Sequence, residues 1–318
     1  MKSAKSANFV QVDHEIRRIL AEEGVTVMPS PEAYEKFEWI REHFEQKPEE
    51  GYFIWVKKQI DYPLFTCITI SSPKISQNPR NLVVIEKNIE IEMHGVCNAV
   101  QKNLCGSHIG HSKIVLKENS WLKMRHFHKW GERDTVSFSL SFFLGKGAKL
   151  SHIYRCLETP ETLKTENNTF LESHSSANLE VAVLAKGGDV DMHDSTFLNG
   201  KNSSGTMRVR MVAEENSKIS AHSRMIANSA GTGHLDCMGL LLAENSSINA
   251  IPELINKNNN ASLTHEASVG KISQENLNYL RSRGLTEDEA INLIVAGFLG
   301  EKTPFTYKGR VVPSKLHM

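Results

Sequence analysis

The chain has 318 residues, of which 40% are apolar and 23% are charged, and its 37 basic side chains balance its 37 acidic ones. This length and composition are those of a globular chain with one large or two modest domains, which excludes a collagen-like or intrinsically disordered protein. Because the formal net charge is zero and no block of like charge occurs, the sequence argues against nonspecific nucleic-acid binding.

The first fifty residues are predicted to form helices. Residues 14–23 and 31–46 place apolar side chains three and four residues apart among charged ones, and Pro31 follows Ser30 as in a first helical turn. After this region the apolar period changes to two in segments rich in Ile, Val and aromatic residues, namely 52–57, 64–70 and 82–93. Strands are therefore expected to dominate the next two hundred residues.

Within this region a motif repeats, in which an apolar residue and a short polar turn precede a new strand. The strand starts are Leu122, Leu150, Val190, Ile219 and Ile248. Successive starts are separated by a nearly constant interval, except for the longer step from Leu150 to Val190, which we attribute to an insertion around 158–168. A coil of about 28 residues cannot bury its apolar face alone and must stack on its neighbours. We therefore predict a mainly β protein with a right-handed parallel β-helix; the alternative is a β-sandwich or jelly roll.

The period becomes helical again after Ile272. Residues 273–283 are predicted to form one helix that stops at Gly284, and a capping box of Thr286 and Glu289 opens a second helix. This hairpin is predicted to cap the solenoid or to dock a partner, and its apolar residues are Leu277, Leu280, Leu293, Ile294 and Phe298.

The chain is accordingly divided into three parts. Residues 1–50 form an N-terminal helical segment, residues 51–272 the β-helix core, and residues 273–318 the C-terminal hairpin with an irregular tail from residue 302. No apolar run approaches the roughly 20 residues of a membrane span, and the N-terminus lacks the apolar stretch of a secretory signal. We expect a cytoplasmic protein.

The repeat predicts which side chains are neighbours, because residues one coil apart lie on adjacent strands at about 4.8 Å. Arg208, Cys237 and Glu266 are separated by two equal intervals of one coil, so we expect them in one column. The guanidinium would favour the thiolate, which binds metals and attacks sulfur donors. His265 would point to the other strand face and could join only at an interface or a bend. A thiolate, an imidazole and a carboxylate suit iron or zinc, and a second subunit could complete such a site.

The cysteines can also be interpreted as core residues without a chemical role. Free cysteine is often a core residue, which is the expectation for Cys67 and Cys156 and an alternative for Cys237. Cys97 and Cys105 are spaced unlike the cysteines of a zinc knuckle. With five cysteines in a chain too large to need disulfides, free thiols are expected.

The segment HFHKW places His126, His128 and Trp130 on one strand face, although paired strand histidines are more often structural than metal ligands. The sequence contains no P-loop, GxSxG or HExxH motif, so hydrolysis of ATP by the chain itself is not expected.

Residues 263–299 resemble the C-terminal signature of the SufB/SufD family of iron–sulfur cluster assembly proteins. The His265–Glu266 pair is similar to SufB rather than SufD, and Cys237 precedes Glu266 by the interval at which the family has a cysteine. The segment GVCNAV also resembles SufB through residues of the family's sulfur-transfer path, here Cys97, His108 and Trp130, while position 128 is His where related sequences can carry Gln. The resemblance covers roughly residues 82–299 and also implies a parallel β-helix.

The resemblance implies a scaffold and not an enzyme. Sulfur would be accepted as persulfide at Cys97 and move past His108, His128 and Trp130 towards Cys237, where a transient iron–sulfur cluster would assemble with the ligands Glu266 and His265. The implied partners are a sulfur donor, a SufC-like ABC-type ATPase on the C-terminal hairpin, and a second copy of the chain in a homodimer, as in a short form of SufB.

Two other classes of function remain open at this stage. One is a SufD-like interaction subunit without its own cluster. The other is a β-helix enzyme acting on polysaccharide, which would need paired carboxylates on adjacent coils, and the sequence offers few beyond Glu214 and Glu215.

Overall fold

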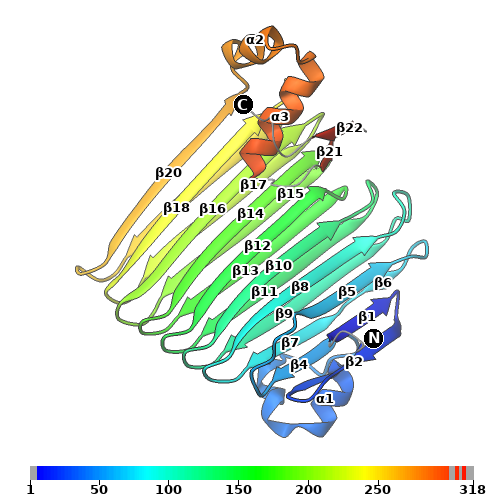
Figure 1. Cartoon of the computed structure of the whole chain (residues 1–318), viewed down its shortest axis with the longest axis vertical. Helices are drawn as coiled ribbons and strands as arrows, with labels where there is room; N and C mark the ends of the chain where they lie inside the picture. Colours follow the sequence, from blue (N-terminus) through cyan, green and yellow to red (C-terminus); the bar gives the residue numbers. More distant parts are fainter. Residues whose placement is uncertain (1–5, 301–304, 308–309, 313–318) are drawn as a thin grey trace.

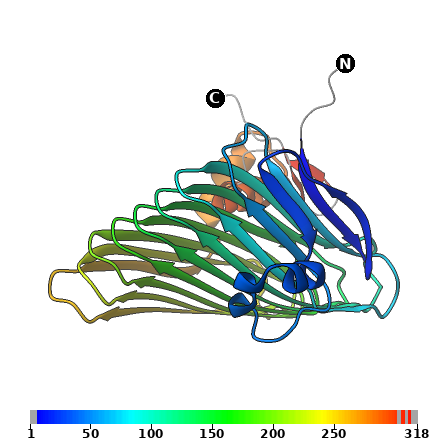
Figure 2. The same cartoon turned by 90° about the horizontal axis from the view of Figure 1, so that it is seen from below.

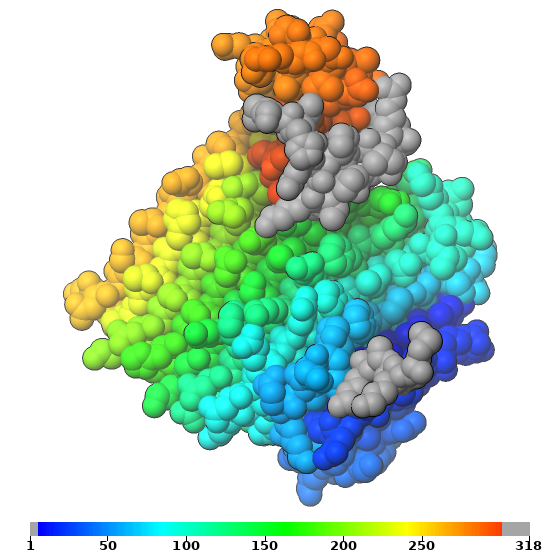
Figure 3. Space-filling view, in the orientation of Figure 1, coloured from blue at the N-terminus to red at the C-terminus, as the bar shows by residue number. Residues whose placement is uncertain are grey.

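The computed structural model describes residues 6–300, 305–307 and 310–312. The chain winds as a solenoid whose coils each contribute one strand to each of two parallel sheets (Figure 1). Figure 2 shows the sheets as facing layers joined by turns, and Figure 3 shows successive coils as diagonal bands across the molecule. The predicted parallel β-helix is confirmed, and the sandwich alternative is wrong.

Both sheets have ten strands. Sheet A contains, in spatial order, β2 (Glu15–Leu20), β1 (Ala7–Val12), β5 (Leu64–Ile70), β8 (Glu90–Ala99), β10 (Trp121–Lys129), β12 (Lys149–Glu158), β14 (Ser176–Lys186), β16 (Ser203–Glu214), β18 (Gly231–Leu241) and β20 (Ser262–Lys271). Sheet B contains β19 (Ser247–Asn256), β17 (Lys218–Ala227), β15 (Asp189–Leu198), β13 (Thr162–Leu171), β11 (Thr135–Leu144), β9 (Ser107–Leu116), β7 (Arg80–Ile85), β4 (Tyr52–Val56) and β3 (Val25–Pro29), with β6 (Ser76–Gln77) beside β9.

Alternation along each strand builds the core. In β11 every second side chain points into the lumen between the sheets and is buried: Val136, Phe138, Leu140, Phe142 and Leu144. Because the strands are parallel and in register, each inward residue lies over an inward residue of the next coil. The lumen is therefore one continuous core along the solenoid axis.

One corner of the coil is held by residues in the left-handed backbone conformation. The five residues at this corner recur once per coil and are Asn88, Asn119, Gly147, His174 and Asn202. Asn and Gly tolerate positive φ better than most residues, which explains the Asn- and Gly-rich turns of the repeat. Side-chain amides also stack between coils: Nδ2 of Asn119 donates to Oδ1 of Asn88 at 3.3 Å.

The predicted insertion around residues 158–168 is wrong. Leu122 and Leu150 are paired in sheet A, whereas Val190 lies in sheet B, where it pairs with Leu163 and Ile219. Each coil has two similar strand starts, one per sheet. The repeat motif at Leu122 and Leu150 belongs to sheet A, and the motif from Val190 onward belongs to sheet B. The longer step is a change of sheet within a regular solenoid.

The N-terminal helices are predicted correctly only in part. Residues 30–43 contain a short helix α1 (Ser30–Lys36) and a 3₁₀ helix η1 (Glu38–His43), which pack on the outer face of sheet B. The helix predicted over residues 14–23 is wrong, because β2 forms there and pairs antiparallel with β1 at the edge of sheet A. Pairing with an existing strand outweighs the helical spacing of its apolar residues.

The C-terminal helical hairpin is confirmed as α2 (Gln274–Ser282) and α3 (Glu287–Leu299), including the capping box at Thr286. Residues of α3 pack on the outer face of sheet A. In the predicted tail, β21 (Phe305–Tyr307) and β22 (Arg310–Val312) pair as a hairpin, and the rest of residues 302–318 lies outside the described residues. Within the described ranges, neither long helix has the length and apolar character needed to cross a bilayer.

Candidate functional site

One thiol and two imidazoles meet inside the solenoid, between β8 and β10. The Sγ atom of Cys97 is 4.0 Å from Nε2 of His126, and the Nε2 atoms of His126 and His128 are 3.0 Å apart. The three potential ligand atoms all lie within 4.8 Å of one another. We call Cys97, His126 and His128 the thiol–imidazole group.

Strand register and parity place the thiol–imidazole group in the lumen. His128 pairs with Cys97, and His126 pairs with Gly95, so all three side chains alternate to the inner face of sheet A. A Cβ atom at Gly95 would lie 3.2 Å from Cδ2 of His126, tighter than an ordinary contact. The glycine therefore leaves the space that the imidazole occupies.

Burial keeps the thiol–imidazole group uncharged. Desolvation, with a smaller effect of Cys67, raises the pKa of the Cys97 thiol to about 12, and desolvation lowers the pKa of His126 to about 4. The pKa of His128 is also well below its usual value, because of desolvation and then because of neighbouring imidazoles. Near neutral pH the group consists of a thiol and two neutral imidazoles.

Further polar rings surround this group. The Oη atom of Tyr154 is 3.1 Å from Nδ1 of His128. The ring centroid of Trp130 is 5.5 Å from that of His128 and 5.0 Å from that of His108. The structure thus brings together the four residues predicted for sulfur transfer, Cys97, His108, His128 and Trp130.

Two members of this site were not assigned from the sequence. The sequence places His126 in a histidine-rich strand without assigning it a role, and it gives Tyr154 no role either. A signal was present, since Tyr154 follows His126 by one coil, and the register pairs the two.

Several buried polar atoms around this site have no hydrogen-bond partner within the described part of the chain: Nδ1 of His126, Nε1 of Trp130 and Nε2 of His152. An unpaired buried polar atom costs about 1–3 kcal/mol. Since native proteins contain few such atoms, their concentration in one stretch of the lumen marks it as a candidate functional site.

Cys237 lies in the same lumen, near its C-terminal end, and is only 2% exposed. The predicted column around it is wrong in register. Cys237 pairs with Val209 in β16 and with Ala267 in β20. The coil from Val209 to Cys237 is therefore one residue shorter than the interval between Arg208 and Cys237. The coil from Cys237 to Ala267 is one residue longer than the interval between Cys237 and Glu266. A shift of one residue moves a side chain to the other face of the sheet.

Arg208 and Glu266 consequently lie on the outer face of sheet A, where both align with Asp236. Nε of Arg208 is 3.2 Å from Oδ2 of Asp236, and Nη2 of Arg210 is 2.6 Å from the same oxygen. The hydrogen bond from Arg210 is the main cause that holds the pKa of Asp236 below its usual value. The predicted guanidinium is therefore committed to Asp236 and does not lie beside the thiol.

His265 is placed on the inner face, against the expectation. It pairs with Leu235, whose side chain is fully buried in the lumen, and it shares the parity of Cys237. His265 and Glu266 are both exposed, because β20 is the last strand of sheet A. The strand face of Cys237 therefore carries His265, two positions from the paired residue Ala267, and does not carry the carboxylate of Glu266.

Facing Cys237, sheet B carries a file of polar residues. Asn167, Asp194 and Ser223 pair with one another on successive strands and point inward. Nδ2 of Asn167 donates to Oδ1 of Asp194 at 2.7 Å, while Oδ2 of Asp194 has no partner in the described residues. Desolvation raises the pKa of Asp194 to about 6 and also raises the pKa of Cys237, which the Ser223 hydroxyl beside the thiol partly offsets. We call Asn167, Asp194 and Ser223 the polar file.

The polar file lies in the part of the lumen between Cys97 and Cys237. In sheet A, one inward row runs from His126 through Tyr154, Val181 and Val209 to Cys237. The four strand steps of this row span about 19 Å. Val181 and Val209 in this row are apolar. At these coils the polar file on sheet B supplies the polar side chains instead. Polar groups therefore line the lumen along its length between Cys97 and Cys237.

A family model described as the SufBD core domain of the SUF system for FeS cluster assembly matches residues 68–298. The chain belongs to the SufBD family. It is 30% identical to an iron–sulfur cluster assembly SufBD family protein of Archaeoglobus fulgidus, over 94% of this chain and 85% of the relative. A relative with the same description from Methanothermobacter thermautotrophicus is 28% identical over 93% of this chain and 78% of its own length. SufBD membership implies a role in iron–sulfur cluster assembly and confirms the resemblance.

In this SufBD chain, the residues predicted for partner docking are mostly engaged within the hairpin or with the solenoid. Leu277 is buried, and Leu280 and Leu293 are half-buried. Ile294 and Phe298 pack against the apolar outer face of sheet A together with the buried residues of α3. The exposed apolar surface of the hairpin is centred on Tyr279, which is 56% exposed.

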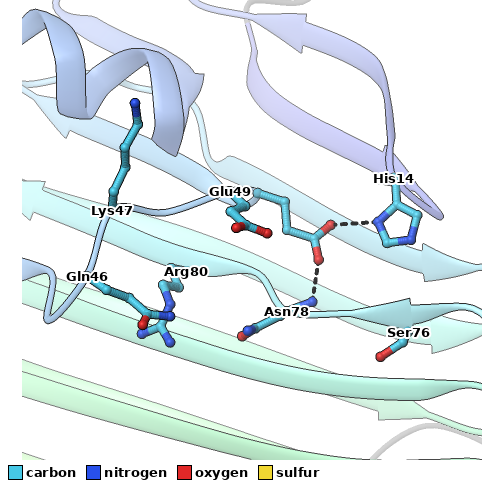
Figure 4. Close-up of a pocket in the computed structure, with 8 residues that line it drawn as sticks. His14, Gln46, Lys47, Glu49, Ser76, Asn78 and Arg80 are labelled. Atoms are coloured by element: carbon cyan, nitrogen blue, oxygen red, sulfur yellow. Dashed lines mark hydrogen bonds and ion pairs between the residues drawn. The ribbon is translucent and has the colours of Figure 1, made fainter.

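A surface hollow of about 380 Å³ lies at the opposite end of the SufBD fold, next to the N-terminal strands (Figure 4). The carboxylate of Glu50 lies 3.2 Å from Nδ1 of His14, accepts a hydrogen bond from Gln11 at 2.7 Å, and also accepts from the backbone N–H of Asn78. These bonds tie three separate chain segments together. These bonds make the hollow a structural joint of the N-terminal end.

Proposed function

We propose that the chain is a SufB-like scaffold that accepts sulfur at Cys97, passes it along the lumen, and builds an iron–sulfur cluster at the end that carries Cys237. The observation that carries this proposal is the series of inward polar side chains between the two thiols, several of whose buried atoms have no hydrogen-bond partner in the described residues. Burying unpaired polar groups is unfavourable, so a merely structural core would fill these positions with apolar residues. The cluster is cargo, and the chain acts as a scaffold and not as an enzyme.

Sulfur acceptance at Cys97 is written as a transfer from a donor persulfide. The Cys97 sulfur attacks the terminal sulfur of the donor, the donor S–S bond breaks, and the departing donor thiolate takes the thiol proton. The donor ends as a thiol and Cys97 as a persulfide, so no external oxidant is needed. His126, whose Nε2 is 4.0 Å from Sγ, is placed to relay the proton.

The cluster site is proposed at the open end of the solenoid, with Cys237, His265 and Glu266 as ligands. Since Cys237 is only 2% exposed and Glu266 is on the other strand face, β20 has to move before the three can share an iron. Helix α2 begins three residues after β20 ends. A SufC-like ABC-type ATPase bound to the α2–α3 hairpin would therefore act directly on the strand that covers the thiol.

The same end of the solenoid supports a homodimer. β20 and β19 are the last strands of their sheets, and within the described residues no strand pairs with their outer edges. Among the described residues, Val269 on the inner face of β20 is left 41% exposed at this end of the lumen. Unpaired edges and an open core are features that proteins cover, and a second copy would also bring a second set of cluster ligands.

We expect Cys97→Ser to lose sulfur acceptance. In the wild type, incubation with a persulfide donor adds one sulfur atom to the tryptic peptide that contains Cys97, which mass spectrometry detects. Cys105→Ser is the matched control, because Cys105 is an exposed thiol outside the lumen. Sulfur on the Cys105 peptide, with none at Cys97 in the wild type, would contradict the assigned entry point.

We expect Val269→Glu to convert the dimer into a monomer, weakening association by at least about tenfold, because the carboxylate would be buried unpaired at the interface. Sedimentation over a concentration series measures this. Ile109→Glu changes a residue of 40% exposure on the outer face of β9 and should leave association unchanged. A Val269→Glu protein that stays dimeric would place the interface elsewhere.

We expect Leu293→Glu to weaken binding of the ATPase by about tenfold, as substitution within an interface core does. The full-length chain is titrated with the purified ATPase in calorimetry. Phe65→Glu, at 43% exposure near the N-terminal end, serves as the control. Equal affinity of both variants and wild type would leave the hairpin as an end cap.

The free thiols require a reducing compartment, for which we propose the cytoplasm; all five cysteines are free in this structure. The SufD-like reading is the competing one within the family, and it is decided by whether a cluster forms on Cys237. SufBD membership gives no support to a carbohydrate-active enzyme.

A further inference from the structure

The thiol–imidazole group has more ligand atoms directed at one point than sulfur transfer requires. Transfer along the lumen needs a thiol and a proton relay. Here two imidazoles point their Nε2 atoms at each other across 3.0 Å beside the thiol. The three potential ligand atoms lie within 4.8 Å of one another, and imidazole is the commonest metal ligand among side chains.

We propose that Cys97, His126 and His128 bind a thiophilic divalent cation of the zinc and ferrous iron class, through Sγ and the two Nε2 atoms, with water as the fourth ligand. This inference goes beyond the proposed function, because cation binding requires neither a sulfur donor nor a cluster at Cys237.

The distances are close to those of a tetrahedral site. With metal–nitrogen bonds of about 2.0–2.1 Å and a metal–sulfur bond of about 2.3 Å, the ligand atoms should be about 3.3 Å (N···N) and about 3.6 Å (S···N) apart. The structure has 3.0 Å between the two Nε2 atoms and 4.0 Å between Sγ and Nε2 of His126. The N···N distance is thus about 0.3 Å short and the S···N distance about 0.4 Å long, so side-chain rotations of the histidines and of Cys97 have to accompany binding.

The surroundings also fit. When Nε2 of His128 binds the cation, the ring hydrogen is on Nδ1, which can then donate to Oη of Tyr154 at 3.1 Å. Such a hydrogen bond orients most metal-binding histidines. A cavity of about 30 Å³ is lined by all three ligands and by Thr66 and Ser112, which leaves room for the cation and its water.

Binding of the divalent cation releases one proton from the chain. The Cys97 thiol releases its proton to solvent, the sulfur becomes a thiolate ligand, and both imidazoles donate lone pairs without change of charge. A bound cation then occupies the sulfur that would accept persulfide. Zinc is therefore expected to inhibit sulfur acceptance at Cys97.

The test uses Co²⁺ as a spectroscopic probe of the purified full-length chain under anaerobic conditions. In the Cys237→Ala chain, which lacks the thiol of the proposed cluster site, we expect thiolate-to-cobalt charge-transfer absorption that saturates at one cation per chain and is removed by Zn²⁺, and the variants below carry this substitution as well. Cys97→Ser should lose this absorption, and His126→Ala and His128→Ala should each weaken binding by at least about tenfold. His94→Ala on the outer face of β8 and Cys105→Ser should bind as the Cys237→Ala chain does.

Absence of the absorption in the Cys237→Ala chain, or its persistence when Cys97→Ser is added, would overturn the inference. Circular dichroism and thermal unfolding of each variant show that a loss of binding is not a loss of fold. Failure here is distinguishable from failure of the proposed function, since persulfide acceptance at Cys97 is measured separately without added metal.

Discussion

Replacement of Cys237 by alanine is expected to abolish iron–sulfur cluster assembly while the chain remains folded. In the scaffold proposal, this thiol is the sulfur ligand at the open end of the lumen, and alanine offers no ligand atom. Anaerobic reconstitution with iron and sulfide bypasses the entry at Cys97, so it tests the end site alone. Visible absorption, bound iron and acid-labile sulfide should all fall by at least about tenfold.

Cys156→Ala is the matched control for this experiment. Cys156 is a fully buried thiol in the same lumen, so both substitutions remove one buried sulfur and should cost similar unfolding free energy. Only the Cys237 variant should lose cluster. Equal cluster content in wild type and Cys237→Ala would show that the chain is SufD-like or that its cluster lies elsewhere.

The second large effect is expected from Asp194→Asn, which should stabilise the protein at neutral pH. Burial raises the pKa of Asp194 to about 6, from an ordinary value of 3.8. The folded chain then holds the proton more tightly than the unfolded chain, so stability falls as pH rises between these two values and stays low above them. A shift of about two pKa units corresponds to about 3 kcal/mol at pH 7.

Urea unfolding from pH 4 to pH 8 measures this effect. The quantity compared is the free energy of unfolding of Asp194→Asn minus that of the wild type. This difference should be about 2–3 kcal/mol larger at pH 7 than at pH 4. Asp191→Asn on the outer face of the same strand is the control, and its difference from the wild type should stay within about 0.5 kcal/mol over this range. A pH-independent difference for Asp194→Asn would mean that this carboxyl group is not desolvated in the lumen.

The stability cost at Asp194 agrees with a functional lumen. An asparagine would keep the hydrogen bond with Asn167 without the buried charge, so stability alone does not explain the aspartate. In the proposed function, the carboxyl group of Asp194 would act while sulfur passes along the lumen from Cys97 to Cys237.

The coil architecture was predictable because stacking imposes a near-constant spacing on apolar residues, as the pairing of Leu122 with Leu150 shows. The capping box at Thr286 was predictable because it depends on neighbours within the first helical turn. The strand at Glu15–Leu20 was not, since its partner β1 decides its conformation and local spacing favoured a helix.

The sequence by itself determined the solenoid, the helical hairpin and the family, because each follows from a local pattern or a near-constant repeat. The tertiary structure alone decided the surroundings of Cys237. The two coils that meet there differ by one residue each, in opposite directions, from the equal interval that separates Arg208, Cys237 and Glu266, and one residue of difference in turn length reverses the face of every side chain on the next strand. That reversal brings His265 to the face of Cys237 and turns Glu266 outward, and no average period read from a sequence can resolve a single residue.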